Sequence, residues 1–385
     1  MSDFLIPTLR EIEKPKVNYL AIGLRSHCKG TFQKPDSDPS KIAMEKLFRV
    51  KENDLIVNIT FAWEGAIAIV KENDEGGLVS HRFPTYTFDT NITSHHFFKH
   101  QFINKRFRYL LDLISPGGAG RNRVMSKKEF VKLKVPLPSV GEQQKIAAFL
   151  TAVDNKIEQL SKKQALLGSW KKGLMQQIFS QAIRFKADDG SAFPVWEEKN
   201  IVELAKTSIG LVTSMTPYYV DKGVPLIRNN DIFQNKIRKE KLIRLDYEFD
   251  QLNKNRRLFT NDIVTVHTGN IGASAVIDEE LNGCQGFATL NTRIKNQNEI
   301  SSSFLCWYYN STRNIKYALS MATGDGRSNY NLKDFNKATI PVPSLPEQTK
   351  IAAFLTAADN KIEQVGKQFD ESKQFKKALL QQMFV

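Results

Sequence analysis

Apolar residues recur in alternating steps of four and three along two long stretches of the chain, beginning at residues 146 and 351. This spacing keeps the apolar side chains in one narrow line, which is typical of a helix that packs along a second helix. We therefore predict two long helices with a paired seam. The seam positions are Ile146, Leu150, Val153, Ile157 and Leu160 in the first helix, and Ile351, Leu355, Ile362 and Val365 in the second.

The two stretches are copies of one another. Residues 136–160 and 341–365 are identical at 19 of 25 positions with a fixed offset of 205, and GLMQQIF (173–179) lies opposite ALLQQMF (378–384). Each copy spans about 38 residues, which makes a helix about 57 Å long. Because the helices alternate with two globular stretches, the simplest closed arrangement pairs them antiparallel. The alternative is that each helix folds back on its own domain.

Both copies begin with the same short motif. Ser139 stands three residues before Glu142, and Ser344 stands three residues before Glu347, each behind closely spaced prolines. Ser-x-x-Glu predicts a capping box, in which the serine oxygen accepts from the glutamate N–H and the carboxylate accepts from the serine N–H. The prolines prevent an upstream element from running into the helix.

The two globular stretches are related more weakly. NDLIVNIT (53–60) is similar to NDIVTVHT (261–268), and each is followed by a glycine and a second β-like run. Aromatic-rich helical spacing and a GAGR or GDGR loop come next in both. We predict an α+β protein with an internal pseudo-twofold repeat, in which two mixed α/β domains alternate with two long helices that pair as an antiparallel coiled coil. The predicted boundaries are 1–138 for the first domain, 139–180 for the first helix, 181–343 for a linker and the second domain, and 344–385 for the second helix.

The charge balance narrows the class of partner. Fifty-five Lys and Arg against 41 Asp and Glu give a formal charge of +14, which attracts polyanions and nucleic acid above all. The three cysteines show neither CxxC spacing nor a disulfide framework, as expected in a reducing compartment. The sequence contains no run of 18 apolar residues and no signal-peptide pattern. We therefore expect a soluble, cytoplasmic protein without a membrane partner.

The sequence resembles a known family at its duplicated helices. A proline-rich entry into E-Q-x-x-I-A-x-x-L, present twice after two divergent domains, resembles the specificity subunit of type I restriction-modification systems. The resemblance covers nearly the whole chain. It implies that each domain is a target recognition domain, which reads one half of a bipartite, asymmetric site in double-stranded DNA.

The resemblance also implies a role for the helices and a set of partners. The helix pair would set the gap between the half-sites and dock two modification (methyltransferase) subunits, and restriction or motor subunits would join the full complex. In one respect this sequence departs from the pattern. The first domain has only MSDFLIPTLREIEKPKVN before YLAIGLR, a shorter entry than that of the second domain.

Catalytic motifs are absent from the sequence. It has no GxxxxGK phosphate loop, no GxGxxG after a strand and no Asn/Asp-Pro-Pro-aromatic motif. Asp188, Asp189, Glu197 and Lys199 loosely imitate a nuclease pattern, but their linker-like surroundings favour a solvated junction. The six histidines have no cysteine or carboxylate partners at metal spacing. We expect a non-catalytic protein with no cofactor and no metal.

Polar residues in loops are the candidates for reading DNA. In the major groove arginine pairs with guanine, and asparagine or glutamine pairs with adenine. Our candidates in the first domain are Arg25, His27, Lys29, Thr60, Trp63, Arg121, Asn122 and Arg123. Those in the second domain are Arg228, Asn229, Asn230, His267, Thr268, Asn270, Arg327 and Asn329. The alternative for each is a solvated loop residue.

The helices carry more apolar residues than one seam needs. These outward positions are Phe149, Trp170, Phe179, Phe354, Phe375 and Phe384. We predict that they receive helices of the modification subunits, and the alternative is burial against the chain's own domains.

Three rival functions remain open. A nucleic-acid scaffold without sequence specificity would show a flat sequence preference. An enzyme with an unrecognised site would show turnover, and a helical adaptor would bind partners without DNA. Near-identical helices beside divergent domains favour the specificity hypothesis, because they separate a common docking surface from two different readers.

Overall fold

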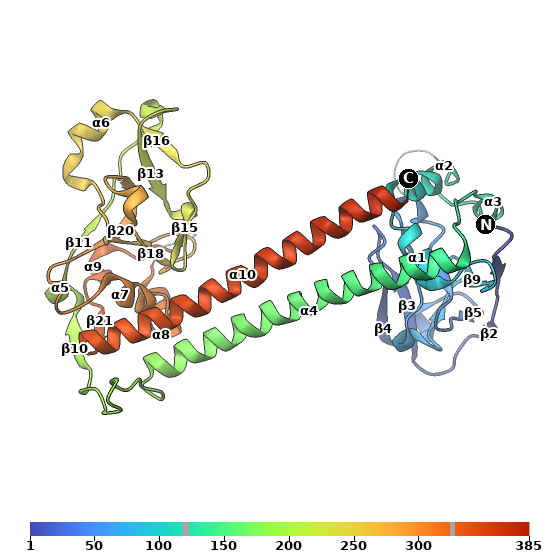
Figure 1. The fold of residues 1–385 in the computed structure, drawn as a ribbon. Coiled ribbons are helices and arrows are strands. Elements are labelled where there is room, and N and C mark those ends of the chain that lie inside the picture. The colour runs from blue at the N-terminus through green and yellow to red at the C-terminus, as the bar shows by residue number, and fades with distance from the viewer. Residues whose placement is uncertain (118–122, 324–327, 385) are drawn as a thin grey trace. The chain divides into compact units, whose positions relative to one another are not determined.

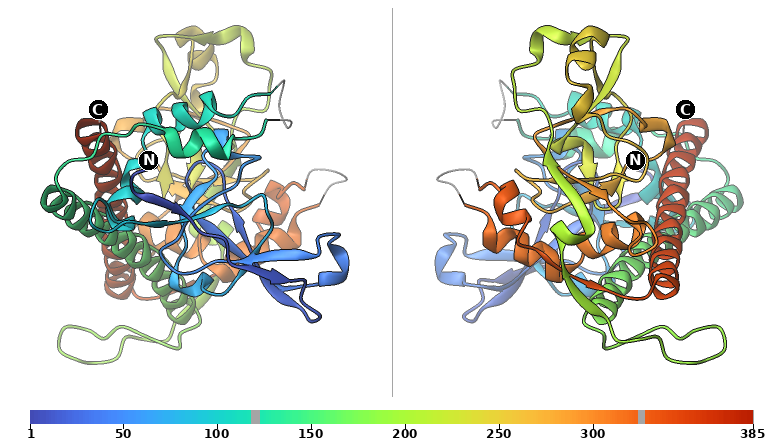
Figure 2. Two further views of the ribbon diagram at one scale, coloured as in Figure 1. Left: turned by 90° about the vertical axis from the view of Figure 1, so that its right-hand side faces the viewer. Right: turned by 90° about the vertical axis from the view of Figure 1, so that its left-hand side faces the viewer.

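The computed structural model describes residues 1–117, 123–323 and 328–384 (Figure 1). The chain divides into two compact units, each with its own hydrophobic core. Unit 1 comprises residues 1–162 and 367–385, and unit 2 comprises residues 163–366. In Figure 2 the left view shows the strands of unit 1, in blue, and the right view shows the strands of unit 2, in green to orange.

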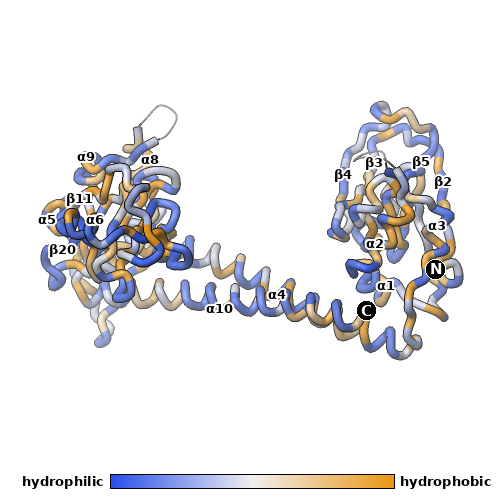
Figure 3. Tube along the Cα trace, turned by 90° about the horizontal axis from the view of Figure 1, so that it is seen from above, coloured by the Kyte–Doolittle hydropathy of each residue, from blue (hydrophilic) through white to orange (hydrophobic). Residues whose placement is uncertain are grey.

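The two longest helices are α4 (Val140–Phe179) and α10 (Leu345–Met383). In each unit the first part of one helix packs with the last part of the other, so the helices pair antiparallel as predicted. The pairing repeats in its contacts. Lys376 lies 2.5 Å from Asp154 in unit 1, and Lys171, 205 positions earlier than Lys376, pairs with Asp359 in unit 2. Apolar and polar residues alternate along both helices (Figure 3).

Unit 1 is built in three layers. An antiparallel sheet in the order β1-β9-β6-β7 lies at its centre. Residues that alternate along β6 face opposite ways: Leu55 and Val57 pack against the helices, and Ile56 packs against a second sheet. This second sheet has the order β2-β5-β8-β3-β4. The element bounds are β1 (Leu5–Pro7), β2 (Glu11–Glu13), β3 (Tyr19–Leu24), β4 (Thr31–Ser37), β5 (Lys46–Arg49), β6 (Leu55–Val57), β7 (Ile67–Ile69), β8 (Leu78–Val79), β9 (Thr85–Phe88), α1 (His95–Gln101), α2 (Lys105–Leu113) and α3 (Lys127–Lys132).

Unit 2 repeats this plan. Its central sheet has the order β11-β20-β17-β18, which matches the central sheet of unit 1 strand for strand. Ile263 of β17 packs on the helix side, and Val264 packs on the opposite side. Its second sheet has the order β12-β16-β13-β19, and two small pairs, β10-β21 and β14-β15, accompany it.

The strands of unit 2 are β10 (Glu197–Asn200), β11 (Ala205–Ile209), β12 (Tyr219–Val220), β13 (Val224–Arg228), β14 (Ile232–Phe233), β15 (Lys236–Ile237), β16 (Ile243–Leu245), β17 (Ile263–Val266), β18 (Ser274–Val276), β19 (Gln285–Phe287), β20 (Thr289–Ile294) and β21 (Thr339–Val342). Its helices are α5 (Ile201–Leu204), α6 (Tyr247–Leu252), α7 (Ser302–Tyr309), α8 (Thr312–Met321) and α9 (Leu332–Phe335). Short 3-10 turns occur at Pro39–Lys41, Ala62–Glu64 and Glu72–Asp74 in unit 1, and at Thr216–Tyr218, Asn229–Asp231, Lys254–Arg256 and Glu279–Leu281 in unit 2.

The two similar β-like pairs in the sequence are hairpins, as predicted. β6 pairs with β7 through Leu55 and Ile69, and β17 pairs with β18 through Ile263 and Val276. A glycine with positive φ precedes the second strand in each, at +83° for Gly272. A Cβ there would come within 2.9 Å of Ile315 Cδ1, so glycine permits both the turn and the close approach of α8.

The two domains differ at their entries. In unit 2 the backbone N–H of Ile201 donates to Ala338 O at 3.0 Å. In unit 1 the amino group of Met1 donates to Leu133 O, 205 positions before Ala338, at 2.6 Å. Residues 1–4 therefore stand where α5 stands in unit 2, where β10 precedes α5 and pairs with β21.

The predicted capping box forms only in part. At the start of α4 the N–H of Glu142 donates to Ser139 Oγ at 3.4 Å. At the start of α10 the prediction is wrong, because Ser344 Oγ is buried without a hydrogen-bond partner among the described residues. The physical reason is that the Glu347 carboxylate accepts hydrogen bonds from Arg184 and Trp196 rather than from the backbone N–H of Ser344.

Candidate nucleic-acid interface

In unit 2 three separate segments bring predicted DNA-reading residues together. Thr268 Oγ1 donates to Asn329 Oδ1 at 2.6 Å, and the N–H of His267 donates to Asn229 Oδ1 at 3.4 Å. The buried strand β17 ends at Val266, immediately before this pair of polar residues. The segment after α8 returns to the same place, where Asn329 forms a bridge with Thr268. We call Asn229, His267, Thr268 and Asn329 the unit 2 cluster.

The unit 2 cluster offers neutral donors and acceptors. Asn329 is exposed, and Asn229, His267 and Thr268 are half-buried. Burial lowers the pKa of His267, so its imidazole is uncharged at neutral pH, with one donor and one acceptor nitrogen. Amides, hydroxyls and a neutral imidazole match the hydrogen-bonding groups on base edges. Asn270 is also exposed, three residues past His267.

Arg228 and Asn230 have structural partners. The Nε atom of Arg228 lies 3.0 Å from the carboxylate of Asp231, whose side chain is only 3% exposed. Arg238 donates to the same carboxylate at 3.4 Å and to Asn230 O at 3.0 Å. The structure thus holds the Arg228 guanidinium within its own loop and leaves the Asn230 side chain exposed.

In unit 1 the candidates Thr60, Trp63 and Arg123 lie together. Trp63 Nε1 donates to Thr60 O at 3.2 Å, and the Arg123 guanidinium carbon lies 5.1 Å from the Trp63 ring centre. Arg123 also lies 2.7 Å from Asp112. Arg82, which the sequence analysis missed, donates to Thr60 Oγ1 at 3.5 Å. Nothing in the sequence distinguished Arg82 from other exposed arginines. We call Thr60, Trp63, Arg82 and Arg123 the unit 1 cluster.

The two clusters occupy equivalent places in the repeated fold. In unit 1 the N–H of Met125 donates to Ile59 O at 2.8 Å, and in unit 2 the N–H of Tyr330 donates to His267 O at 2.9 Å. Met125 and Tyr330 are 205 positions apart, the offset of the helix repeat. Each bond joins the residues just past a central strand, β6 or β17, to the segment that follows α2 in unit 1 or α8 in unit 2. One scaffold therefore presents two different sets of side chains at one location.

The remaining unit 1 candidates lie in the turn between β3 and β4. Arg25, His27 and Lys29 are exposed there. Arg25 Nη1 donates to Thr31 O at 3.0 Å, and its guanidinium lies 5.3 Å from the Phe32 ring centre. The N–H of His27 donates to Glu64 O, next to Trp63. This turn therefore adjoins the unit 1 cluster. The candidates Arg121, Asn122 and Arg327 lie outside the described residues.

The nuclease-like residues do not converge on one site. Asp188 binds Lys350 at 2.6 Å, and Asp189 accepts from Ser191 Oγ at 2.6 Å. Lys199 binds Glu299 at 2.7 Å and Glu197 at 3.2 Å. Across residues 1–117, 123–323 and 328–384, no group of three or more His, Cys, Asp or Glu is arranged to hold a metal ion.

The cysteines are free thiols with suppressed reactivity. Burial raises the pKa of Cys28 to about 11 and that of Cys284 to about 12, and it raises the pKa of Cys306 as well. Since the thiolate is the reactive form, these groups are packing residues rather than nucleophiles. No helix within the described part of the chain has the length and apolar character to cross a membrane.

The helix residues divide into buried, half-buried and exposed sets. Of the predicted seam, Leu150, Leu160, Ile351, Leu355 and Val365 are buried, and Ile146, Val153, Ile157 and Ile362 are half-buried. Four predicted docking residues, Phe149, Trp170, Phe354 and Phe375, are between 38% and 52% exposed.

Two predicted docking residues are covered by the chain itself. Phe179 packs on Tyr308 with ring centres 5.6 Å apart, and Phe384 packs on Phe97 at 5.7 Å. Both side chains are at most 6% exposed. The alternative left open by the sequence, burial against the chain's own domains, holds for these two residues. The end of each helix is anchored to a domain and leaves no aromatic surface there.

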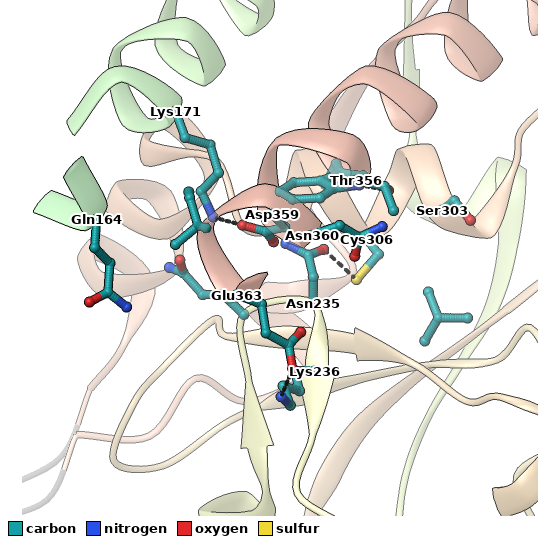
Figure 4. Close-up of a pocket in the computed structure, with 14 residues that line it drawn as sticks. Gln164, Lys171, Asn235, Lys236, Ser303, Cys306, Thr356, Asp359, Asn360 and Glu363 are labelled. Atoms are coloured by element: carbon teal, nitrogen blue, oxygen red, sulfur yellow. Dashed lines mark hydrogen bonds and ion pairs between the residues drawn. The ribbon is translucent and has the colours of Figure 1, made fainter. Parts of the chain in front are cut away.

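Where the helix pair meets the domain in unit 2, a cavity of about 540 Å³ is lined by polar and apolar groups in similar measure (Figure 4). Lys171 of α4 reaches Asp359 of α10, and Lys236 lies 3.4 Å from Glu363. Cys306 Sγ donates to Asn235 Oδ1 at 3.4 Å. These groups pair with one another and fix the domain against the helices.

Comparison with known proteins relates the chain to specificity subunits. It is 26% identical over 275 residues to the putative type I restriction enzyme MjaX specificity subunit of Methanocaldococcus jannaschii, covering 66% of this chain and 59% of that protein. It is 26% identical over 273 residues to the type I restriction enzyme EcoBI specificity subunit of Escherichia coli, covering 64% and 57%. The chain thus spans less than two thirds of the length of these relatives.

Solved structures share the fold. The HsdS subunit from Thermoanaerobacter tengcongensis matches with a TM-score of 0.54 and 16% identity, covering 100% of this chain and 95% of that one. The type I restriction-modification S subunit from M. genitalium matches with a TM-score of 0.56 and 15% identity, covering 98% and 96%.

The family match covers both halves of the chain. The profile described as "Type I restriction modification DNA specificity domain" matches residues 6–167 and again residues 195–369. Each matched segment contains one globular domain and part of the following long helix. The chain therefore belongs to the type I restriction modification DNA specificity domain family, and it carries two copies of the domain.

Proposed function

We propose that this chain is the non-catalytic DNA-specificity subunit of a type I restriction-modification complex. In this proposal residues 1–138 and 181–343 are target recognition domains, and each reads one half of a bipartite, asymmetric site in double-stranded DNA. One observation carries the proposal: two copies of a DNA specificity domain present different polar clusters at equivalent positions. A shared scaffold with different side chains is what the reading of two different half-sites requires.

Each cluster suits a different set of base edges. In unit 2 the exposed amide of Asn329 suits the bidentate pair that recognises adenine. The Asn229 amide supports the loop, because its oxygen accepts from the His267 N–H and its nitrogen donates to Ala288 O. In unit 1 the exposed Arg82 supplies a guanidinium group, which suits guanine or phosphate. The Arg123 guanidinium is held by Asp112 and Ser115 O and positions the Trp63 ring. The formal charge of +14 supports phosphate binding without regard to sequence.

The helices carry the second part of the proposal. Residues 139–180 and 344–385 set the gap between half-sites and dock two modification subunits. The proposed contacts are the partly exposed aromatic residues Phe149, Trp170, Phe354 and Phe375. Aromatic residues are enriched in protein interfaces and contribute much of the binding energy there. Restriction or motor subunits would join the same complex and supply its chemistry.

The test is sequencing of genomic N6-methyladenine in cells that carry the cognate modification subunit, with and without this chain. We expect a split motif that depends on the chain. Asn329→Ala removes both an exposed amide and the acceptor for Thr268 Oγ1, so it should relax or change one half of the motif and leave the other intact.

The variant for unit 1 is Thr60→Ala, at the position equivalent to Thr268, the residue that donates to Asn329 in unit 2. It should affect the half that Asn329→Ala leaves unchanged. If methylation depends on the chain but both variants alter the same half, the assignment of one half-site to each domain is wrong. If complexes assemble and no motif depends on the chain, the specificity proposal itself fails.

A further inference from the structure

The first turns of α10 are covered by a segment that follows α4 in the sequence. We call residues 184–196 the strap. Arg184 donates from Nη2 and Nε to the two carboxylate oxygens of Glu347, at 2.7 and 3.1 Å. Trp196 Nε1 donates to the same carboxylate at 2.9 Å. Glu347 is fully buried as a result. A paired arginine fork with an indole donor satisfies the carboxylate almost completely.

The strap makes two more contacts along the same face of α10. Lys350 Nζ lies 2.6 Å from Asp188 Oδ1 and 5.8 Å from the Phe193 ring centre. Phe185 meets Phe354 edge to face at 5.6 Å. Positions 347, 350 and 354 are three and four residues apart, so they line one side of a helix. A carboxylate, an ammonium and a phenyl ring on one helix face each receive a complementary group.

The same three side chains recur on α4 at an offset of 205. They are Glu142, Lys145 and Phe149, and we call them the open face. Glu142 and Lys145 are exposed, and Phe149 is 47% exposed. Among the described residues, no side-chain group pairs with the Glu142 carboxylate or with the Lys145 ammonium. The repeat has duplicated the receiving groups, and among the described residues the segment that fills them lies on α10 alone.

The surroundings of the open face are repeated too. Gln348 donates from Nε2 to Pro343 O and Glu299 O, both at 2.8 Å, which fixes the start of α10 to its domain. Gln143 donates from Nε2 to Pro138 O and Ile92 O, both at 2.9 Å, which fixes the start of α4 in the same way. The helix turn that carries Glu142 is therefore fixed to its domain by the same kind of glutamine hydrogen bonds as the turn that carries Glu347. This pre-organised face does not have to fold before it binds.

We infer that the open face binds an extended segment of another polypeptide, with an arginine for Glu142, a carboxylate for Lys145 and an aromatic ring for Phe149. The argument is complementarity that this chain itself demonstrates at Glu347, Lys350 and Phe354. A bidentate arginine on Glu142 and a ring on Phe149 would bury surface that is now in water. The inference goes beyond the proposed function, since it holds whether or not the chain directs methylation.

The probe is a fluorescein-labelled synthetic peptide of residues 181–197, QAIRFKADDGSAFPVWE, added to the full chain. Fluorescence anisotropy should show saturable binding. Glu142→Gln should weaken the binding by about tenfold or more, because it removes a charged hydrogen-bond acceptor for Arg184 of the peptide. Phe149→Ala should weaken it as well. A peptide in which Arg184 is replaced by Gln should bind the unchanged protein as weakly as the original peptide binds the Glu142→Gln protein. The altered peptide should bind the Glu142→Gln protein with no further loss of affinity.

Two controls separate the open face from other sites. Glu158→Gln removes an exposed glutamate elsewhere on α4, so it should leave peptide binding unchanged. Glu142 is exposed, so circular dichroism should show that its variant folds normally. Absence of saturable binding would overturn the inference. Binding that Glu142→Gln does not weaken would also overturn it, because the peptide would then occupy the Glu347 site or an unrelated surface.

Discussion

Two glutamates that the repeat places at the same position of the same helix have opposite environments. Glu347 is fully buried beneath Arg184 and Trp196, and Glu142 is exposed. The local sequences around them are nearly identical, so local propensity does not explain the difference. The cause lies in Arg184 and Trp196, more than 150 positions away in sequence, which reach Glu347, whereas no described side chain reaches the Glu142 carboxylate.

This difference predicts unequal costs for the same substitution. Glu347→Gln should destabilise the protein by about 2 kcal/mol, because it leaves the Arg184 guanidinium without its carboxylate in a partly buried position. Glu142→Gln should change the free energy of unfolding by no more than about 0.5 kcal/mol. Urea unfolding followed by tryptophan fluorescence would measure both. Equal costs would show that the buried ion pair contributes no net stability.

His100 of α1 is a second residue whose environment carries a consequence. It is fully buried, and both ring nitrogens lack hydrogen-bond partners within the described residues. Its pKa is lowered to about 4, first by burial and then by the nearby positive charge of Lys99. Asp154 acts in the opposite direction, and Lys376 and His96 add to the lowering.

The lowered pKa predicts a loss of stability in mild acid. An unfolded histidine with a pKa near 6.5 binds protons that buried His100 does not bind until the pH approaches about 4. Stability should therefore be full above pH 6.5 and should fall as the pH decreases from about 6.5 towards 4. His95, whose pKa is also lowered to about 4, acts in the same direction. Melting temperatures at pH 7 and pH 5 would measure the loss.

The matched variants are His100→Leu and His81→Gln. His100→Leu should reduce the loss of melting temperature between pH 7 and pH 5, because it removes one group that must protonate. His81 is exposed, and its replacement should leave the loss unchanged. A pH dependence that is identical in the wild type and in His100→Leu would contradict this account.

At the scale of elements, the helix pair is held by a few buried leucines rather than by its full apolar surface. Leu150 of α4 and Leu355 of α10 are 205 positions apart and fully buried, and their neighbours Phe149 and Phe354 are 47% and 38% exposed. Adjacent residues on a helix point about 100° apart, so a seam residue and an exposed residue alternate naturally. The stability of the pair should therefore depend on the seam.

Leu150→Ala should lower the free energy of unfolding by about 2–5 kcal/mol, the range for a leucine truncated inside a packed core. Phe149→Ala removes a larger side chain from a position that is about half exposed and should cost much less, about 0.5 kcal/mol. Chemical denaturation of the two variants gives the comparison directly. If Phe149→Ala costs as much as Leu150→Ala, the exposed ring is part of the core and cannot serve as a docking contact.

The sequence predicted these elements well where a local period carries the information. The heptad spacing located both helices, and the similarity of residues 53–60 to 261–268 located both hairpins. It failed where distant segments decide the outcome. No period shows that Phe179 ends under Tyr308, or that the carboxylate of Asp231 holds Arg228. Arg82 joined the unit 1 cluster for the same reason, since only the folded chain brings it to Thr60.

At the scale of the whole molecule, the duplicated chain keeps the same backbone scaffold in both units and varies the side chains of the two clusters. The central sheets match strand for strand, and the bonds from Met125 to Ile59 and from Tyr330 to His267 repeat at equivalent places. Thr60 and Thr268 correspond, but the side chains around them differ, with Trp63 and Arg123 in unit 1 and His267 and Asn329 in unit 2. Under the proposed function, a change confined to one cluster would alter one half-site and leave the scaffold, the helices and the other half-site as they are.

The helix pair is the element whose length should set the gap between half-sites, and this can be tested without touching either reader. Gln164 of α4 faces Gly366 of α10, where a Cβ would meet its amide nitrogen at 2.7 Å. Inserting seven residues into each helix at this level keeps the heptad phase and adds about 10.5 Å of rod, since the rise is about 1.5 Å per residue. Because duplex DNA rises about 3.4 Å per base pair, the preferred gap should grow by about three base pairs while both half-sequences stay the same.

Insertion into one helix alone breaks the pairing and should abolish methylation of the split motif. Sequencing of genomic N6-methyladenine reads the gap directly, and an unchanged gap in the doubly lengthened chain would rule out the helix pair as the ruler.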